Sequence, residues 1–385
     1  TKTVTIDAGR PYNLGRTLDV NKKSYRFLLG FRGTLDSGWD WEAAGVVSKA
    51  EMLDIAHDRF GYDLIHAELN GSLRTTDQVW NIFSTDWDNN NSERVRVDVT
   101  REDTSELKMF DFKLSNPEVF QLPAGPVAAL VGVEWRMETY HDDRDPRLDG
   151  TITNKDFRSN ISKTKTYPYL SSVVGSSPTG DVYGVKRVDS IFAELSIPVT
   201  EKLDAQVALR HESFSDSKST TVSKLALGYN LNEWIKLRAS ASTSFRTPNI
   251  IQVNQTEVAR TGTRNDAVHQ YAIWVKNGKQ IVSSGSGFLK DYTISNSIRY
   301  ATGAENLVPE ESTNTSLGFV LTPMDNLTIT YDIWEIEKEN TIGLFGRNNQ
   351  SIYDLLLRTR LGIGGATTVA EMEAWCKANV NSQDS

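Results

Sequence analysis

The chain has 385 residues, of which 38% are hydrophobic and 24% charged, with a formal net charge of −8 and a pI near 5.3. This acidic balance argues against nucleic acid as a partner, because nucleic-acid-binding proteins present a basic surface. No apolar run approaches the roughly 18 residues that a membrane-spanning helix needs. A single cysteine, Cys376, excludes an internal disulfide framework.

The first part of the chain contains segments in which apolar and polar residues alternate, as in a β-strand with one apolar face. Residues 1–23 form a lead-in to which the sequence assigns no structure, and the polar stretch 74–103 gives no orientation. Residues 117–125 predict a turn, because they contain proline and glycine. The strands expected here are 24–35, 39–49, 62–73, 94–100, 104–115 and 126–140.

The second part contains two long polar loops, expected at 141–184 and 249–311, and a third long segment at 341–385. A hairpin is expected at 273–282 within the second loop, and a short helix after Thr368 in the third. A parity slip at Trp334 predicts a bulge. The remaining strands are expected at 188–199, 203–214, 220–231, 235–246, 312–322 and 326–339.

The strand expected at 235–246 shows the clearest alternation. At about 3.3 Å per residue it would be about 40 Å long, and a tilt of about 45° would give it a rise near the thickness of a bilayer core. Its polar face carries three cations, which a buried core would not accept unpaired but a polar lumen would. The charged residues predicted to face such a lumen are Glu134, Arg136, Glu194, Arg210, Glu212, Lys236 and Arg238.

Short connections alternate with long polar ones along the whole chain. This layout predicts an all-β, antiparallel, up-and-down transmembrane β-barrel with short periplasmic turns and long extracellular loops. We expect about 11 long strands, which form one side of a barrel. An apolar sheet with an open edge is not viable in lipid, so the chain is expected to be part of a larger barrel.

Two stretches resemble motifs of TonB-dependent outer-membrane receptors. Residues 244–249 resemble the S-F-R-x-P-N that ends a strand in that family, and residues 303–312 resemble its G-x-x-N-L-x-P-E-x-S, which leads into the next strand. Residues 132–136 are similar to its G-x-E-[YW]-R. The matching positions of the first two motifs are Ser244, Phe245, Arg246, Pro248, Asn249, Gly303, Asn306, Leu307, Pro309, Glu310 and Ser312.

The resemblance runs over about residues 25–340 and implies a barrel of about 22 strands, plugged by a separate N-terminal domain. Such receptors lie in the outer membrane of Gram-negative bacteria and import scarce nutrients of the siderophore-iron, cobalamin or glycan class. Energy comes from the TonB complex through the plug domain, which these residues do not contain. The resemblance therefore implies as partners the outer-membrane lipid, the TonB complex and a small-molecule or oligosaccharide ligand.

The motif residues favour structural roles over ligand contact. Arg246 is expected to pair with a carboxylate of a neighbouring strand, and Pro309 and Glu310 to fix the start of a strand. The acidic cluster Asp142–Asp149 could bind Ca²⁺, but its spacing fits no known loop and a solvated loop is favoured. The five histidines make no pair with metal-ligand spacing. We expect no metal and no cofactor.

Three functions remain open on the sequence. The first is active transport through a plugged barrel, and the second is a passive porin-like channel of the same architecture. The third is a soluble all-β carbohydrate-binding protein or hydrolase, which would need a catalytic carboxylate pair in a cleft. No nucleophile motif appears and no carboxylate pair stands out, so we do not expect an enzyme.

Overall fold

The computed structural model describes residues 15–69, 81, 84, 92–153, 167–168, 170–265, 293–344, 346, 349–350 and 352–353. Antiparallel strands dominate them, and ten strands form one sheet in the order β1-β2-β3-β4-β5-β6-β7-β8-β11-β12. The strands of this sheet are β1 (Leu18–Thr34), β2 (Asp40–Phe60), β3 (Arg96–Leu122), β4 (Gly125–Arg144), β5 (Val182–Thr200), β6 (Leu203–Phe214), β7 (Thr220–Asn232), β8 (Ile235–Arg246), β11 (Glu310–Met324) and β12 (Leu327–Glu339).

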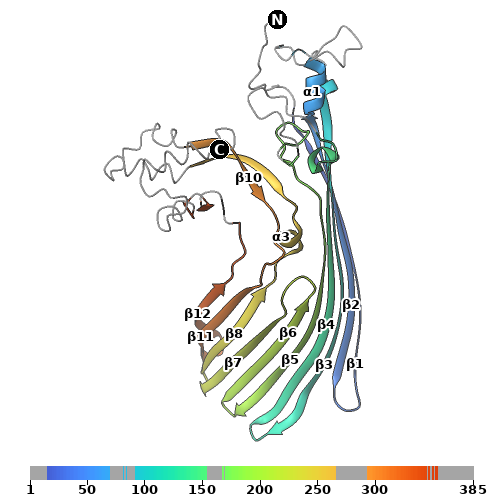
Figure 1. The fold of residues 1–385 in the computed structure, drawn as a ribbon. Coiled ribbons are helices and arrows are strands. Elements are labelled where there is room, and N and C mark those ends of the chain that lie inside the picture. Colours follow the sequence, from blue (N-terminus) through green and yellow to red (C-terminus); the bar gives the residue numbers. More distant parts are fainter. Residues whose placement is uncertain are drawn as a thin grey trace, which may run out of the picture.

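Figure 1 shows that this sheet curves into an open trough, with the tight hairpins at one end and the longer connections at the other. We call these the hairpin end and the loop end. The hairpin end holds the turns at 35–39, 123–124, 201–202, 233–234 and 325–326. The predicted up-and-down order is confirmed, because each strand pairs antiparallel with the next one in the sheet.

The loop end carries the remaining elements. Two short helices, α1 (Tyr62–Leu69) and η1 (Ser92–Val95), lie between β2 and β3, and α2 (Pro146–Asp149) follows β4. The connection from β8 to β11 contains α3 (Ile250–Asn254) and a separate two-stranded sheet of β9 (Val258–Asn265) and β10 (Thr293–Ala301). Among the described residues, no helix is long and apolar enough to cross a membrane.

The strand expected at 62–73 is wrong, because the described part of this segment is the helix α1. The amide of Ile65 donates to the carbonyl of Gly61 at 3.0 Å, which closes a helical turn. Leu64 and Ile65 both pack against the buried side chains of Phe60 and Val95. Neighbouring residues can share one partner on a helix but not on a strand, so local packing overrides the alternation.

The sequence also divided β3 wrongly. From Arg96 onward the strands expected at 94–100 and 104–115 are one continuous strand, whereas Arg94 and Val95 belong to η1, and most of the turn expected at 117–125 also belongs to β3. Register shifts between Asn116 and Phe120, which shows that the proline-containing segment is a bulge and not a turn. The bulge expected at Trp334 is absent, since β12 keeps its register there and shifts only near Leu327. The expected hairpin at 273–282 and the helix after Thr368 lie outside the described residues.

One face of the sheet carries a continuous apolar band, which we call the apolar belt. It contains the side chains whose exposure would decide the barrel hypothesis: Val131, Leu209 and Leu237 are 42%, 53% and 40% exposed. A face so apolar and so exposed needs an apolar surrounding. Other exposed members are Phe27, Phe31, Val47, Phe110, Trp135, Ile191, Leu195, Val207, Leu225, Leu227, Leu317, Tyr331 and Ile333.

The apolar belt crosses the strands obliquely. Its upper edge lies at Tyr25 on β1 and at Ile333 on β12. When register partners are followed from strand to strand, Tyr25 is level with Val185 on β5, and Ile333 is level with Ile197 on β5. Val185 and Ile197 are about 40 Å apart along β5, and the edge strands β1 and β12 are about 43 Å apart across the sheet. The strands therefore tilt by about 40° to the belt, which is the tilt of transmembrane barrels.

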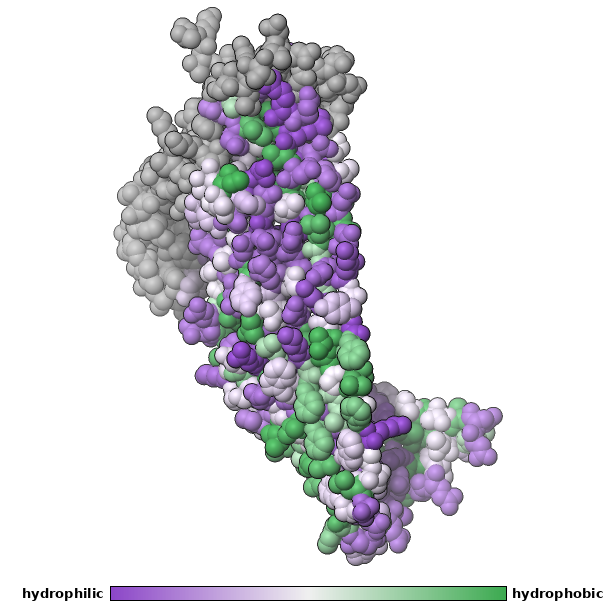
Figure 2. All heavy atoms as spheres, turned by 90° about the vertical axis from the view of Figure 1, so that its right-hand side faces the viewer, coloured by the Kyte–Doolittle hydropathy of each residue, from purple (hydrophilic) through white to green (hydrophobic). Residues whose placement is uncertain are grey.

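The strands β1–β4 extend well past the belt toward the loop end. The longest, β3, has 27 residues, which at about 3.3 Å each exceed twice the height of a bilayer core even when tilted. Figure 2 shows this side of the molecule, where hydrophobic side chains gather over the lower part and hydrophilic ones over the upper part. The upper parts of β1–β4 thus form a polar wall above the belt.

Candidate functional site

The face opposite the apolar belt lines the concave side of the sheet and is charged. On β4 and β6, Arg210 lies between Glu134 and Glu212, at 3.3 and 2.5 Å, and also donates to the hydroxyl of Ser190 at 3.0 Å. Arg136 adds contacts to Glu134 at 3.6 Å and to Glu138 at 3.1 Å. Opposite charges thus neutralise one another along this part of the concave face.

The other charged residues predicted to face a lumen contact polar or oppositely charged side chains on other strands. Glu194 of β5 accepts a hydrogen bond from Gln206 of β6. Arg238 of β8 donates to Asp332 of β12 across the intervening strand β11. Lys236 lies 3.8 Å from the carboxylate of Asp204. The first contact joins consecutive strands, whereas Arg238 and Asp332 join strands that are far apart in sequence.

The two family-like motifs meet at the loop end. Arg246, the last residue of β8, donates through Nε and Nη2 to the two carboxylate oxygens of Glu310, the first residue of β11, both at 2.7 Å. The expected pairing of Arg246 with a neighbouring strand is confirmed. The backbone amide of Ile342 also donates to Glu310 at 2.7 Å, which adds the segment after β12. One carboxylate therefore holds three segments together.

Immediately after Arg246 the chain folds across the concave side as a strap, residues 247–255 (Figure 1). Asn249 and Gln252 form a reciprocal capping box, with hydrogen bonds of 2.7 and 2.9 Å, which starts α3. Ile250 is buried on β5, where Gly184 leaves room for it: a Cβ at Gly184 would collide with the Ile250 side chain. The glycine thus allows the helix to approach the strand closely.

Lys186 of β5 fixes the strap from below. Its ammonium group donates to the hydroxyl of Thr247 at 2.7 Å and to the carbonyl of Pro248 at 2.8 Å, and lies 3.6 Å from Asp216. It also sits over the ring of Phe214, 5.4 Å from its centre. The side chain is only 4% exposed. A charge this deeply buried is tolerated because two hydrogen-bond acceptors, one carboxylate and one aromatic ring surround it.

The second motif returns onto the same strap. The amide of Gly303 donates to the carbonyl of Gln255 at 2.8 Å, and that of Ala304 to the carbonyl of Gln252 at 3.0 Å. A Cβ at Gly303 would collide with the backbone of Val253, so glycine is required for this approach. Both ends of the β9–β10 excursion are therefore tied to one strap.

The remaining motif residues lie around this junction. Ser244 and Ser312 share a hydrogen bond of 2.7 Å between β8 and β11. Phe245 pairs with Glu311 in the same ladder, and Pro248 is fully buried, with its carbonyl hydrogen-bonded to Lys186. In the connection to β11, Asn306 is exposed, Leu307 is half-buried and Pro309 is buried.

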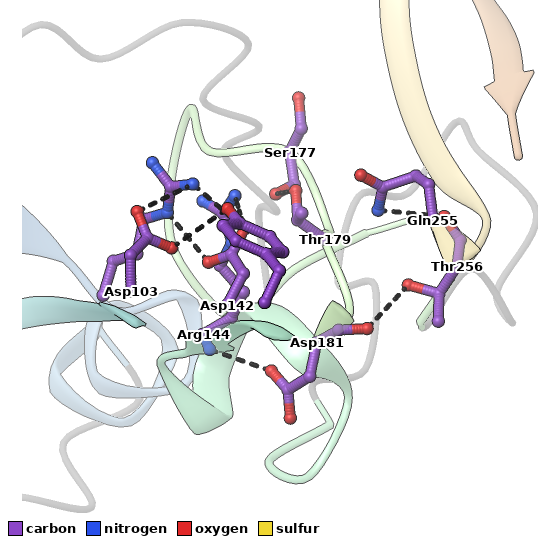
Figure 3. Close-up of polar contacts among 10 residues, drawn as sticks. Asp103, Asp142, Arg144, Ser177, Thr179, Asp181, Gln255 and Thr256 are labelled. Carbon is purple, nitrogen blue, oxygen red and sulfur yellow. Dashed lines mark hydrogen bonds and ion pairs between the residues drawn. The ribbon is translucent and has the colours of Figure 1, made fainter. Parts of the chain in front are cut away.

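A second polar cluster lies on the concave side of β3 and β4 above the belt (Figure 3). Arg101 donates two hydrogen bonds of 2.9 and 3.0 Å to the carboxylate of Asp142, and Arg144 donates one of 2.6 Å to the same carboxylate. Arg101 also lies 3.1 Å from Asp103, which accepts from the hydroxyl of Tyr140 at 3.4 Å. Two guanidinium groups and two carboxylates balance, so the cluster braces the wall.

This cluster connects to the strap through the β4–β5 connection. The amide of Arg144 donates to the side chain of Asp181 at 2.8 Å, and the hydroxyl of Thr256 donates to the Asp181 carbonyl at 3.4 Å (Figure 3). Burial raises the pKa of the Asp181 carboxyl, and the nearby carboxylates of Asp149 and Asp143 raise it further. A continuous path of contacts thus links β3, β4, the β4–β5 connection and Thr256, the residue that follows the strap.

The solvated acidic loop expected around Asp142 is wrong. Asp142 belongs to β4 and Asp145 caps α2. Each is only 3% exposed, and the carboxylate of each accepts hydrogen bonds from an arginine side chain. In the described part of the chain no group of three or more His, Cys, Asp or Glu is arranged to hold a metal ion. Sequence reasoning also missed Lys186, which it left in a connection, although Lys186, Val188 and Ser190 continue the alternation of β5.

Comparison with known families gives the same architecture. The model of the "TonB dependent receptor-like, beta-barrel" family matches residues 3–367. The chain belongs to this family. Its ten-stranded sheet, with the apolar belt outside and the charged face inside, is therefore part of a TonB-dependent receptor β-barrel. A comparison with curated proteins found no match.

Solved structures that resemble this receptor chain are distant in sequence. The siderophore receptor PirA from Acinetobacter baumannii is 17% identical, with a TM-score of 0.48, and the match covers 84% of this chain and 35% of that one. A ferric enterobactin receptor mutant (PfeA) from Pseudomonas aeruginosa, in complex with enterobactin, is 16% identical with a TM-score of 0.47, covering 83% and 35%. The RagAB peptide transporter is 11% identical with a TM-score of 0.48, covering 84% and 30%. The chain thus spans about a third of the length of these structures.

Proposed function

We propose that this chain is part of an outer-membrane receptor of a Gram-negative cell that imports a scarce nutrient of the siderophore-iron, cobalamin or glycan class with energy from the TonB complex. The long connections at the loop end would capture the ligand outside the cell. The charged concave face would line the route inward once a plug domain rearranges. The hairpin end would then face the periplasm.

One observation carries this proposal: a single tilted sheet of a TonB-dependent receptor-like chain has an exposed apolar belt on one face and ion pairs on the other. Lipid can cover the belt, and water inside a barrel can solvate the charges. The edge strands β1 and β12 each have one partner in the sheet, so closing the barrel requires further strands. The expected lead-in at 1–23 ends earlier than predicted, because β1 begins at Leu18, so the proposed division is a barrel from Leu18 to residue 340 and an extracellular segment at 341–385.

Uptake by whole cells tests the proposal. Cells that lack the gene for the full-length receptor should lose energy-dependent uptake of one nutrient, and the gene in trans should restore it. Uptake is measured with labelled ferric chelates, cobalamin and oligosaccharides, with and without a functional TonB protein. Uptake that persists unchanged without TonB would refute active transport.

A passive channel gives a different result in the same architecture. The purified full-length protein in a planar bilayer should show no steady ion conductance when a plug fills the lumen. Stable conductance steps would instead support a porin-like channel. A soluble carbohydrate-binding protein or hydrolase would be extracted without detergent and would migrate identically on gels with and without boiling, whereas a folded barrel shifts.

A further inference from the structure

Two cations lie at and just above the upper edge of the apolar belt, on the same face of the sheet. Lys108 of β3 and Arg187 of β5 are both exposed, and both are register partners of Met137, which lies between them on β4. Neighbouring strands lie about 4.8 Å apart, so the two Cα atoms are about 10 Å apart. In the described part of the chain neither side chain forms an ion pair.

The nearest cation on the same face shows a different arrangement. Lys49 of β2 contacts Glu51 at 2.7 Å and Glu106 at 3.6 Å, so its charge is neutralised within the protein. The charges of Lys108 and Arg187, by contrast, are not neutralised by an ion pair and face the surroundings of the protein. One carboxylate, Asp189, lies on the same face just below Arg187 and is exposed.

The height of the two cations relative to lipid follows from their neighbours. Phe110 and Trp135, one step below Lys108 and Met137, are register partners and exposed members of the belt. Lys108 therefore begins where the hydrocarbon ends, and Arg187 lies one step higher, because Asp189 separates it from Ile191, the first belt residue on β5. Long basic side chains at this level extend along apolar surface and place their charge among the lipid headgroups.

We propose that Lys108 and Arg187 form a docking site on the outer face of the barrel for the phosphate of an anionic lipid headgroup. This inference rests on the outer-membrane placement proposed above. The lipid chains would lie on Phe110, Trp135 and Ile191, and the phosphate would sit over Met137 between the two cations. Lysine supplies a point charge and arginine a two-pronged donor, the combination that recognises phosphate oxygens.

The test titrates phosphatidylglycerol into the full-length receptor in neutral detergent and counts bound lipids by native mass spectrometry. A basic residue near an anionic surface contributes about fivefold in affinity, so K108Q/R187Q should bind about 25-fold more weakly. The control K202Q/K218Q removes the same charge from two exposed connections, one at each end of the sheet, and should bind as the wild type does. D189N should bind more tightly, because it removes the competing carboxylate.

Each result decides the proposal. Unchanged lipid binding by K108Q/R187Q overturns it, and so does an equal loss in K202Q/K218Q, which would trace the effect to net charge. Inorganic phosphate should not bind; if it binds and the same double variant abolishes this, the site takes a free anion instead. The gel shift on boiling is recorded separately for every protein, so failure to form a barrel is distinguished from loss of lipid. R187Q alone, expected about fivefold weaker, replaces the double variant if that does not fold.

Discussion

Replacing Lys186 by methionine should release the strap from the sheet. Methionine keeps the length of the side chain but removes the hydrogen bonds to Thr247 and to the carbonyl of Pro248, and leaves Asp216 without its cation. Breaking a buried ion pair by removing one partner costs about 3–5 kcal/mol. The 3.6 Å separation from Asp216 and the 15% exposure of its side chain place the cost at the lower end, at about 3 kcal/mol.

That free energy corresponds to an increase of about 100-fold in the population of the detached strap. Hydrogen exchange on the full-length receptor in detergent micelles measures it, because the amides of Val253 and Gln255 are hydrogen-bonded only while α3 is formed. Both amides should exchange about 100-fold faster in K186M, and amides in the centre of β6 should not change. The control K202M, in an exposed turn, should leave all of them unchanged.

Unchanged exchange of Val253 and Gln255 in a folded K186M barrel would refute the reasoning, since the buried ammonium would then contribute nothing to the strap. Faster exchange across the whole sheet would refute it equally. That outcome would mean that Lys186 supports the barrel as a unit rather than a local contact.

Three further outcomes follow from the same geometry. G184A should detach α3 and raise strap exchange about tenfold, because overpacking costs about 1–3 kcal/mol, whereas G30A meets only ordinary contacts at 3.6 Å and should have no effect. V207K places a charge on the belt and should lower the free energy of unfolding by about 2–4 kcal/mol, measured by urea unfolding from vesicles. Q206K, at the inward-facing neighbour, should change that free energy by less than about 0.5 kcal/mol. Equal costs for the two variants would contradict the assignment of faces. Asp181 has a pKa raised above 3.8, so its contribution to stability is complete below that pH and is lost as pH rises through the folded-state pKa. D181N, which keeps the acceptor for the Arg144 amide, should remove this pH dependence in strap exchange.

Alternation was sufficient to predict most of the sheet because a barrel strand has an environment of only two kinds. Each residue from Ile235 to Arg246 meets either lipid or the lumen, so the parity of the sequence gives the face directly. The same logic failed for residues 62–69, where the chain leaves the sheet and packs on Phe60 and Val95. It also failed at 94–122, where Pro117 suggests an interruption but pairing with β4 resumes at Phe120 after a bulge.

The strap could not be predicted from the sequence. Residues 247–255 have no periodicity, and their conformation depends on Gly184, Lys186 and Gly303, which approach from other parts of the chain. Contacts of this kind join residues of large sequence separation, and no local pattern records them. The pairing of Arg246 with a carboxylate could be anticipated, but its convergence with the amide of Ile342 on Glu310 could not.

The sequence by itself determined the fold class, the apolar and charged faces and the family, because these follow from period-two patterning and two short motifs. Only the tertiary structure showed how the strands are staggered into a belt at about 40°, which side chains pair across the concave face and how one strap joins both ends of the long β8–β11 connection. The physical reason is that patterning reports the solvent each residue meets, whereas register and ion pairing depend on which distant strand becomes its neighbour.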